Sequence, residues 1–369
     1  MKILKNPEDI YSGIENFIKS LKKNTTDYSY YPALKGLTNH GKNLELGFSC
    51  YALKIEYMLG HIVNINNIQT REWVDYLNSF QKNVKNLPEN SYVDNELLAA
   101  YLKPDFKTKV KNSLKHSLTS LNIKTYDSNH QKLKKSINAE SKQAIATLYQ
   151  VGHKNNRFLQ SDFKEYRDLE RYLNTLDWSK PWATGAQYSS FCVYTTTQDL
   201  DFRENLIEFI KFKADKETGS YFTKTPESSR EIINGAMKVI TGLDWLNHEI
   251  HYPKELIDFC IDNKPFLEGC DIVDYVYTLY KCSQQVDYRK KEINLIFSKL
   301  SESLLDLYYF KEGGFSYFPK KSQSHYYGLK ITNSEDTPDI HGTLLCLWAL
   351  NMILDNLEIL SPEKKLIKP

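Results

Sequence analysis

The chain is a succession of helical segments in which amphipathic stretches alternate with stretches that are apolar on nearly every face. Apolar residues recur every three or four positions along most of its 369 residues, which is the period of an α-helix. No series of alternating apolar and polar positions predicts a sheet, so we expect an all-α fold. The helices are expected at 7–23, 44–62, 70–87, 95–101, 106–121, 136–151, 162–176, 187–197, 202–212, 230–246, 255–261, 271–282, 291–309 and 339–354.

The alternation of helix character predicts two layers of helices. A helix that is covered on all sides has apolar residues on every face, whereas an outer helix has one polar face that is exposed to water. Helical hairpins of this kind cannot bury their apolar faces alone and are stable only when stacked on their neighbours. We therefore expect a single α/α-toroid domain over residues 1–369, with inner and outer rings of helices around a central cavity. An open helical solenoid is the structural alternative.

Three connecting segments stand out by their polarity or turn residues. Residues 122–135 are polar and Lys-rich and are expected to form a mobile surface connection, and residues 357–369 form a polar tail. Residues 178–182, together with Gly185, are expected to form a turn before the next helix begins at Gln187.

Composition narrows the class of protein without naming a reaction. The 48 basic and 46 acidic residues give a net charge of +2, so charge offers no argument for a nucleic-acid or membrane partner. No run of 18 or more apolar residues predicts a transmembrane helix, and residues 1–5 lack the apolar core of a secretion signal. The six cysteines form no Cys-x-x-Cys pair and mostly lie in apolar helices, which suits reduced thiols. We therefore expect a cytoplasmic protein.

The start of the last apolar helix carries the first set of candidate catalytic residues. Asp339 and His341 lie two positions apart at the predicted N-terminus of this helix, where an Asp is also explained by helix capping alone. Histidine, tyrosine and carboxylate side chains together provide general acid–base chemistry. The candidate catalytic set is His341, Asp339, Asp336, His325 and Tyr327.

Equivalent positions on the preceding apolar helices give candidate substrate-binding residues. Asp271 and Asp274 begin one such helix, and Arg230 and Asn234 begin another. In a toroid, the starts of the inner helices surround one mouth of the cavity. The candidate substrate-binding set is Asp271, Asp274, Arg230, Asn234, Tyr326 and Trp182, although core packing explains a tryptophan equally well.

Residues 180–355 resemble the repeat of terpenoid cyclases and of the β subunits of protein prenyltransferases. Those repeats join a glycine–aromatic turn to a loop and an inner helix. The matching turns here are residues 219–222, residues 313–316 and, more loosely, residues 268–271. The resemblance implies an α/α toroid and a hydrophobic, isoprenoid substrate in a cyclase-like or prenyl-transfer-like reaction.

The functional motifs of these families are not reproduced. Asp271 can be placed on the zinc-binding Asp of the prenyltransferases, but Val273 then stands where their Cys would be, and His341 lies only near their His. A catalytic zinc needs three protein ligands and an open position. We expect no cofactor, with zinc or magnesium as the weaker alternative. In the frame of the cyclase acid motif, His341 stands in place of the Asp that protonates an alkene.

The function expected from the sequence is therefore an enzyme with a small-molecule substrate in the cavity at the inner-helix N-termini. A toroid that acts on a glycan substrate, as a hydrolase, lyase or epimerase, is the second hypothesis. A non-catalytic helical scaffold that binds a partner in its concavity is the third. The sequence does not fix an oligomeric state.

Overall fold

The computed structural model describes residues 7–24, 27–62, 67–102 and 128–369. The described part is mostly helical. Each of its strands is only two residues long and pairs with one other strand, which confirms the all-α prediction. The elements are α2 (Pro7–Leu21), α3 (Asn39–Asn43), α4 (Leu46–Met58), α5 (Ile68–Asn78), β1 (Gln81–Lys82), β2 (Ser91–Tyr92), α6 (Asn95–Leu102), α8 (Asn129–Gln150), α9 (Tyr166–Thr175), α10 (Pro181–Thr197), α11 (Arg203–Lys211), α12 (Ser229–Trp245), α13 (Pro253–Asp262), α14 (Gly269–Gln285), α15 (Lys290–Leu304), β3 (Tyr308–Tyr309), β4 (Gly314–Phe315), β5 (His325–Tyr326), β6 (Leu329–Lys330) and α16 (Ile340–Asn356).

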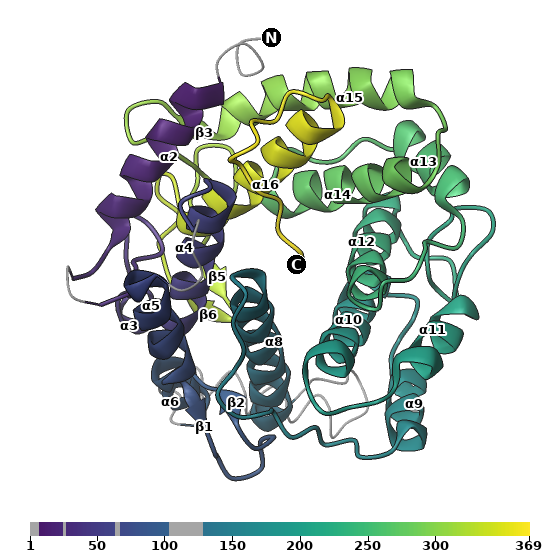
Figure 1. Cartoon of the computed structure of the whole chain (residues 1–369), viewed down its shortest axis with the longest axis horizontal. Coiled ribbons are helices and arrows are strands. Elements are labelled where there is room, and N and C mark those ends of the chain that lie inside the picture. The colour runs from purple at the N-terminus through teal and green to yellow at the C-terminus, as the bar shows by residue number, and fades with distance from the viewer. Residues whose placement is uncertain (1–6, 25–26, 63–66, 103–127) are drawn as a thin grey trace, which may run out of the picture.

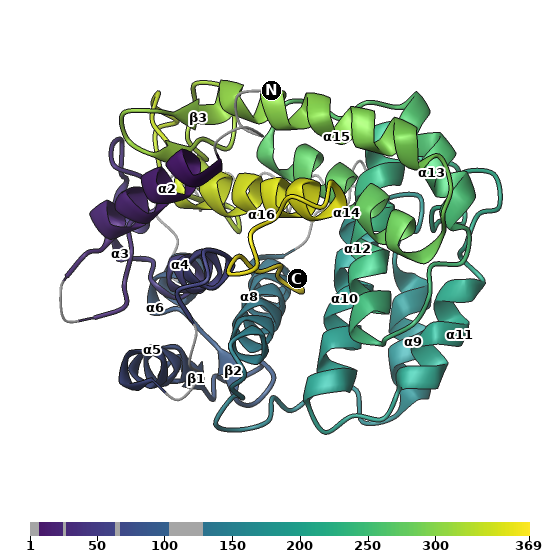
Figure 2. The same ribbon diagram turned by 45° about the horizontal axis from the view of Figure 1, so that its top comes forward.

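Six of these helices contact one another in a closed cycle. In order around the cycle they are α4, α8, α10, α12, α14 and α16, and α16 returns to contact α4. Neighbours run in the same direction. The starts of α12 and α14 meet where Arg230 binds Asp271, and the ends of α8 and α10 meet where the Tyr149 hydroxyl donates to the Thr197 carbonyl over 2.7 Å. The remaining longer helices lie outside this cycle (Figures 1 and 2).

Close packing of α10 against α12 depends on glycines inside both helices. A Cβ added to Gly235 would lie 2.5 Å from the Pro181 Cβ, and one added to Gly185 would lie 3.1 Å from the Lys238 Cβ. Gly185 was expected in a turn, but it is part of α10, which begins at Pro181. Glycine serves here to bring two helices together, and that use cannot be told from a turn in the sequence alone.

The predicted glycine–aromatic turns form before two of the helices in the cycle. Gly219 and Gly313 have φ values of +72° and +81°, a region that suits glycine. After each turn the aromatic residue pairs with the segment that follows the preceding outer helix: Tyr221 with Ala214 after α11, and Phe315 with Tyr308 after α15. The two segments are therefore structural repeats of one outer helix, one tight turn and one helix of the cycle.

The prediction of a polar connection at 122–135 is wrong for the second half of that segment. Helix α8 begins at Asn129, and Ser128 and Gln131 form a reciprocal capping box at its start. Only Leu133 is apolar and buried in the first two turns, so the apolar periodicity there is weak. The helix expected at 106–121 and residues 122–127 lie outside the described residues.

The polar tail, residues 357–369, lies across the C-terminal ends of the helices in the cycle. The backbone N–H of Lys365 donates to the Met58 carbonyl at the end of α4, and that of Lys368 donates to the Gln150 side chain at the end of α8. The indole of Trp245 at the end of α12 donates to the Pro369 carbonyl over 2.5 Å. The tail thus bridges three helices and covers this end of the cycle (Figure 1).

The described structure agrees with the expected state of the cysteines. All six are free thiols, and every one except the half-buried Cys270 is buried. None of the described helices has the length and the apolar character that crossing a membrane requires.

Candidate functional site

Asp339 caps helix α16. Its carboxylate accepts the backbone N–H groups of Gly342 and Tyr317, each over 2.8 Å, and that of Gln323 over 3.1 Å. Burial raises the pKa of Asp339 to about 6, while the backbone donors work in the opposite direction. Because both carboxylate oxygens are occupied by backbone donors, Asp339 holds the start of α16 and the neighbouring loop in place.

His341, the second residue of α16, faces the centre of the helix cycle. Its ring stacks on Tyr51 of α4 at 4.7 Å with an interplanar angle of 5°, and it packs against Tyr317 at 5.3 Å. Its Nδ1 is buried without a hydrogen-bond partner among the described residues. Burial, with the neighbouring charges of Lys238 and Lys54, lowers the pKa of His341 to about 3. The imidazole is therefore neutral at pH 7 and offers a free ring nitrogen.

Tyr326 and Tyr327 come to the same side of the centre as His341. The Tyr326 hydroxyl donates to Glu140 Oε1 of α8 over 3.1 Å, and its ring packs against Tyr51. Burial raises the pKa of Glu140 well above its usual range and so favours the neutral acid. Tyr327 has a φ of 43° and is half-buried. Tyr326 thus links the loop before α16 to α8.

A second group of predicted residues meets between the starts of α12 and α14. Asp271 accepts the Arg230 guanidinium at 3.0 Å and the Asn234 amide at 2.8 Å. The Arg230 guanidinium also binds Glu268 and lies 5.4 Å from the ring centre of Trp182. A crevice of about 20 Å³, room for a single water molecule, adjoins this cluster. The predicted substrate-binding residues here are therefore largely satisfied by one another.

Asp274 lies one turn further along α14 and pairs with a lysine that the sequence analysis did not single out. The Lys238 Nζ lies 3.2 Å from Asp274 Oδ1, and Asp274 Oδ2 is buried without a partner among the described residues. Burial raises the pKa of Asp274 to about 6, opposed by the charge of Lys238. At pH 7 the Asp274 carboxyl group is therefore still mostly ionised.

Two more lysines, Lys54 of α4 and Lys142 of α8, point to the same centre without a carboxylate. Neither makes a hydrogen bond or ion pair with any residue that the structure describes, and Lys54 is only 7% exposed. Burial lowers the pKa of Lys54 to about 8, and burial with the charges of Lys54 and Lys238 lowers the pKa of Lys142 to about 7. Helices α4 and α12 lie opposite each other in the cycle. The charges of Lys54 on α4 and Lys238 on α12 both act on Lys142. Because these two helices lie on opposite sides of the cycle, all three lysine side chains must extend towards its centre.

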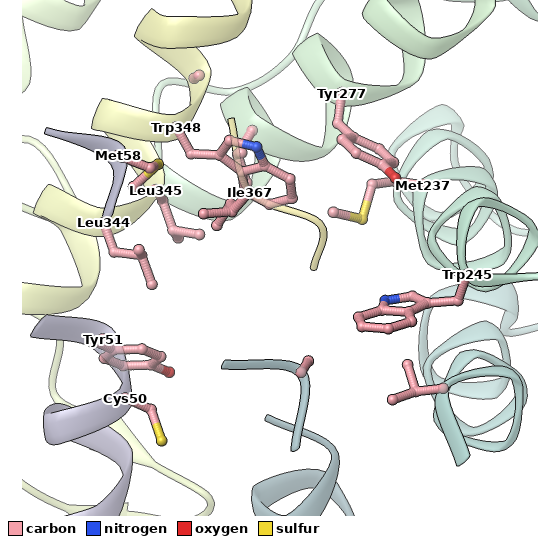
Figure 3. Packing of buried hydrophobic residues seen from close by; sticks show 14 of the residues in the cluster. Cys50, Tyr51, Met58, Met237, Trp245, Tyr277, Leu344, Leu345, Trp348 and Ile367 are labelled. Atoms are coloured by element: carbon pink, nitrogen blue, oxygen red, sulfur yellow. The ribbon is translucent and has the colours of Figure 1, made fainter. Parts of the chain in front are cut away.

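The groups at the centre combine burial with residual exposure. Lys142, His341 and Tyr327 lie deep enough for their pKa values to shift strongly, yet each keeps accessible surface. Figure 3 shows apolar side chains from several helices on the same inner side of the cycle as Tyr51. These are Met237, Trp245, Tyr277, Leu344, Leu345, Trp348 and, from the tail, Ile367.

Two predicted catalytic residues do not join this group. His325 is exposed and binds the neighbouring Ser324 hydroxyl at 2.8 Å. Asp336 is also exposed, and it accepts a hydrogen bond from Tyr309 in the outer strand β3. Both lie on the loop before α16, whose polar side chains turn outward, whereas sequence proximity alone suggested that they would line the cavity.

The missed lysines did leave a signal in the sequence. Lys54 and Lys238 are each the one charged side chain within an otherwise uncharged stretch, residues 46–55 and 232–243 respectively. A charge at the centre of a helix that is buried all round needs a partner or a function. That argument identifies Lys54 and Lys238, but Lys142 lies in a polar stretch and only the packing of α8 reveals it.

Comparison of the chain with protein-family models, with curated proteins and with solved structures finds no match. Among the residues that the structure describes, no group of three or more His, Cys, Asp and Glu side chains is arranged to hold a metal ion.

Proposed function

We propose that this chain is an α/α-toroid enzyme whose central cavity binds an amphiphilic anion, an isoprenoid diphosphate, for a prenyl-transfer-like or cyclase-like reaction. The observation that carries the proposal is the convergence of Lys54, Lys142 and Lys238 beside an apolar and aromatic wall. The closed cycle of six parallel helices with further helices outside it is what a toroid requires.

The charge balance at the centre favours an anionic ligand. Asp274 offsets one of the three lysines, and burial favours the neutral form of Glu140, which leaves Lys54 and Lys142 without an opposing carboxylate among the described residues. Burying ammonium groups without a partner is costly, and proteins keep such groups where they act on a ligand. Phosphate oxygens would supply the missing partners for Lys54 and Lys142.

The wall beyond the lysines suits the hydrocarbon part of such a substrate. In an allylic diphosphate, the C–O bond breaks with its electron pair moving to the diphosphate oxygen, and the lysines would stabilise that charge. The carbocation left behind is stabilised by aromatic faces, which Trp348, Tyr277 and Tyr51 provide. The neutral imidazole of His341 would accept the proton that the product loses.

Calorimetric titration with inorganic diphosphate and with farnesyl diphosphate tests the proposal. We expect both to bind, the farnesyl ester more tightly, and farnesol only weakly. Lys54→Met and Lys142→Met should each weaken diphosphate binding by at least about tenfold, the size of one lost charge-assisted hydrogen bond. Lys216→Met, at an exposed lysine without a partner in the described structure, is the matched control.

The two other hypotheses predict different results. A glycan-active site needs available carboxylates, but Asp339 and Asp271 are occupied by hydrogen bonds within the protein. A non-catalytic scaffold would bind neither diphosphate nor its farnesyl ester. Equal diphosphate affinity in the wild type and in both lysine variants would refute the proposal.

A further inference from the structure

A separate cavity lies between α8, α9 and α10, away from the three converging lysines. Its volume is about 230 Å³, and its floor is formed by α8 and α10, where the two helices are held together by the Tyr194 hydroxyl donating to the Asn138 carbonyl over 2.7 Å. The cavity opens to solvent on one side, where the exposed Gln131, Lys135 and Asp162 form its rim.

The walls of the cavity are aromatic and are arranged as a box. Phe163 lies 5.3 Å from Tyr172 and 5.4 Å from Phe191, ring centre to ring centre, and Phe191 lies 6.2 Å from Tyr194. Phe163–Phe191 and Phe191–Tyr194 are edge-to-face contacts, and the rings of Phe163 and Tyr172 are tilted by 31°. Rings that present both faces and edges around one space suit an aromatic guest.

The polar groups at the cavity point to a ligand that is uncharged but carries a hydrogen-bonding atom. Lys134 and Asp162, both at the cavity, pair at 2.7 Å and offset each other. The Asn138 side chain makes no hydrogen bond with another described residue. The Gln187 amide oxygen accepts only a long bond of 3.4 Å from Tyr172. Two amides are thus free to bind a ring N–H or hydroxyl.

We infer that this cavity is a binding site for a compact, neutral aromatic molecule of two fused rings with one polar ring atom, of the indole or naphthol type. An apolar cavity of about 150 Å³ in another protein holds benzene, so about 230 Å³ accommodates one further fused ring. The site is independent of the proposed diphosphate site. Tyr194 separates the two regions, since it forms one wall here and the Tyr327 phenol near the centre contributes to raising its pKa.

Titration calorimetry with indole, on the full chain, tests the inference. We expect one indole per chain and at least about tenfold weaker binding in Gln187→Phe, whose ring fills the cavity. Ala183→Phe, an exposed position one turn earlier on α10, is the matched control and should bind indole as the wild type does. No indole binding to the wild type, or unchanged binding in Gln187→Phe, would overturn the inference.

A second variant keeps the test decisive if Gln187→Phe fails to fold. Tyr172→Ala removes one wall at a half-buried position and enlarges the cavity. The preference should then move from indole to the three-ring carbazole. An unchanged preference would count against the site. Lys54→Met should leave indole binding unaltered, and loss of indole binding in that variant would place the ligand at the centre instead.

Discussion

Two clusters of charged residues lie on the same ring of helices, one between the starts of α12 and α14 and one at the centre, and they differ in one respect. Between α12 and α14, Arg230 and Asp271 bind each other directly. At the centre, Lys54 and Lys142 have no carboxylate partner among the described residues. A paired cluster stabilises the fold, whereas an unpaired one destabilises it and persists where it has a function. The comparison therefore predicts opposite effects of mutation at the two places.

The largest expected effect is destabilisation by Asp271→Ala. Removing Asp271 leaves the Asn234 amide without its acceptor and the Arg230 guanidinium with Glu268 alone, and the loss of a buried, charged hydrogen-bond partner costs about 3 kcal/mol. Denaturant unfolding followed by circular dichroism measures the loss. Asp306→Ala, at an exposed position, should stay close to the wild type. A loss as small as that of the control would remove the contrast between the clusters.

Lys54→Met should act in the opposite direction and stabilise the protein. Its pKa falls from 10.5 to about 8 on folding, so the wild type carries a cost of up to about 3 kcal/mol below pH 8, and we expect a gain of roughly 2 kcal/mol. As pH rises from about 8 towards 10.5, Lys54 loses its proton in the folded protein and burial no longer acts on a charge, so the advantage of the variant should disappear. Unfolding curves at about pH 7 and about pH 10 measure this. A destabilised variant at pH 7 would show that Lys54 has a partner.

The smallest effect concerns the pH dependence of anion binding at the centre. An anion raises the lowered pKa values of Lys142 and Lys54, so binding takes up protons. Affinity should be greatest below about pH 7 and fall as pH rises through the pKa values of the complex, by about tenfold at pH 9. Sulfate, whose own charge is constant over this range, is the probe, and calorimetry in two buffers counts the protons. A pH-independent affinity would contradict binding at these lysines.

The general course of the helices could be predicted because apolar periodicity records which faces are buried. The helices α2, α6, α11, α12 and α13 lie within one or two residues of their predicted ends. The prediction failed where apolar periodicity does not mark the helix. Helix α8 begins in a Lys-rich stretch, and Gly185, which was expected in a turn, lies inside α10. In both places, packing against neighbouring helices outweighs the local sequence preference.

The candidate site was predicted only in part, for a related reason. Position at a helix start correctly grouped Arg230, Asn234 and Asp271, because starts of parallel helices lie together. It did not distinguish a side chain that faces the centre, such as His341, from one that turns outward, such as Asp336. Sequence adjacency on a loop says little about side-chain direction.

The sequence by itself determined the all-α class, the alternation of helix types, and the glycine turns at Gly219 and Gly313, since each follows from local periodicity or from a backbone angle that glycine favours. Only the tertiary structure decided which charges meet. Whether a lysine is paired depends on residues far away in the chain: Lys238 finds Asp274 on the next helix, whereas Lys54 and Lys142, on α4 and α8, find none among the described residues. Electrostatic energy depends on distance in space, and the closed cycle of helices sets those distances.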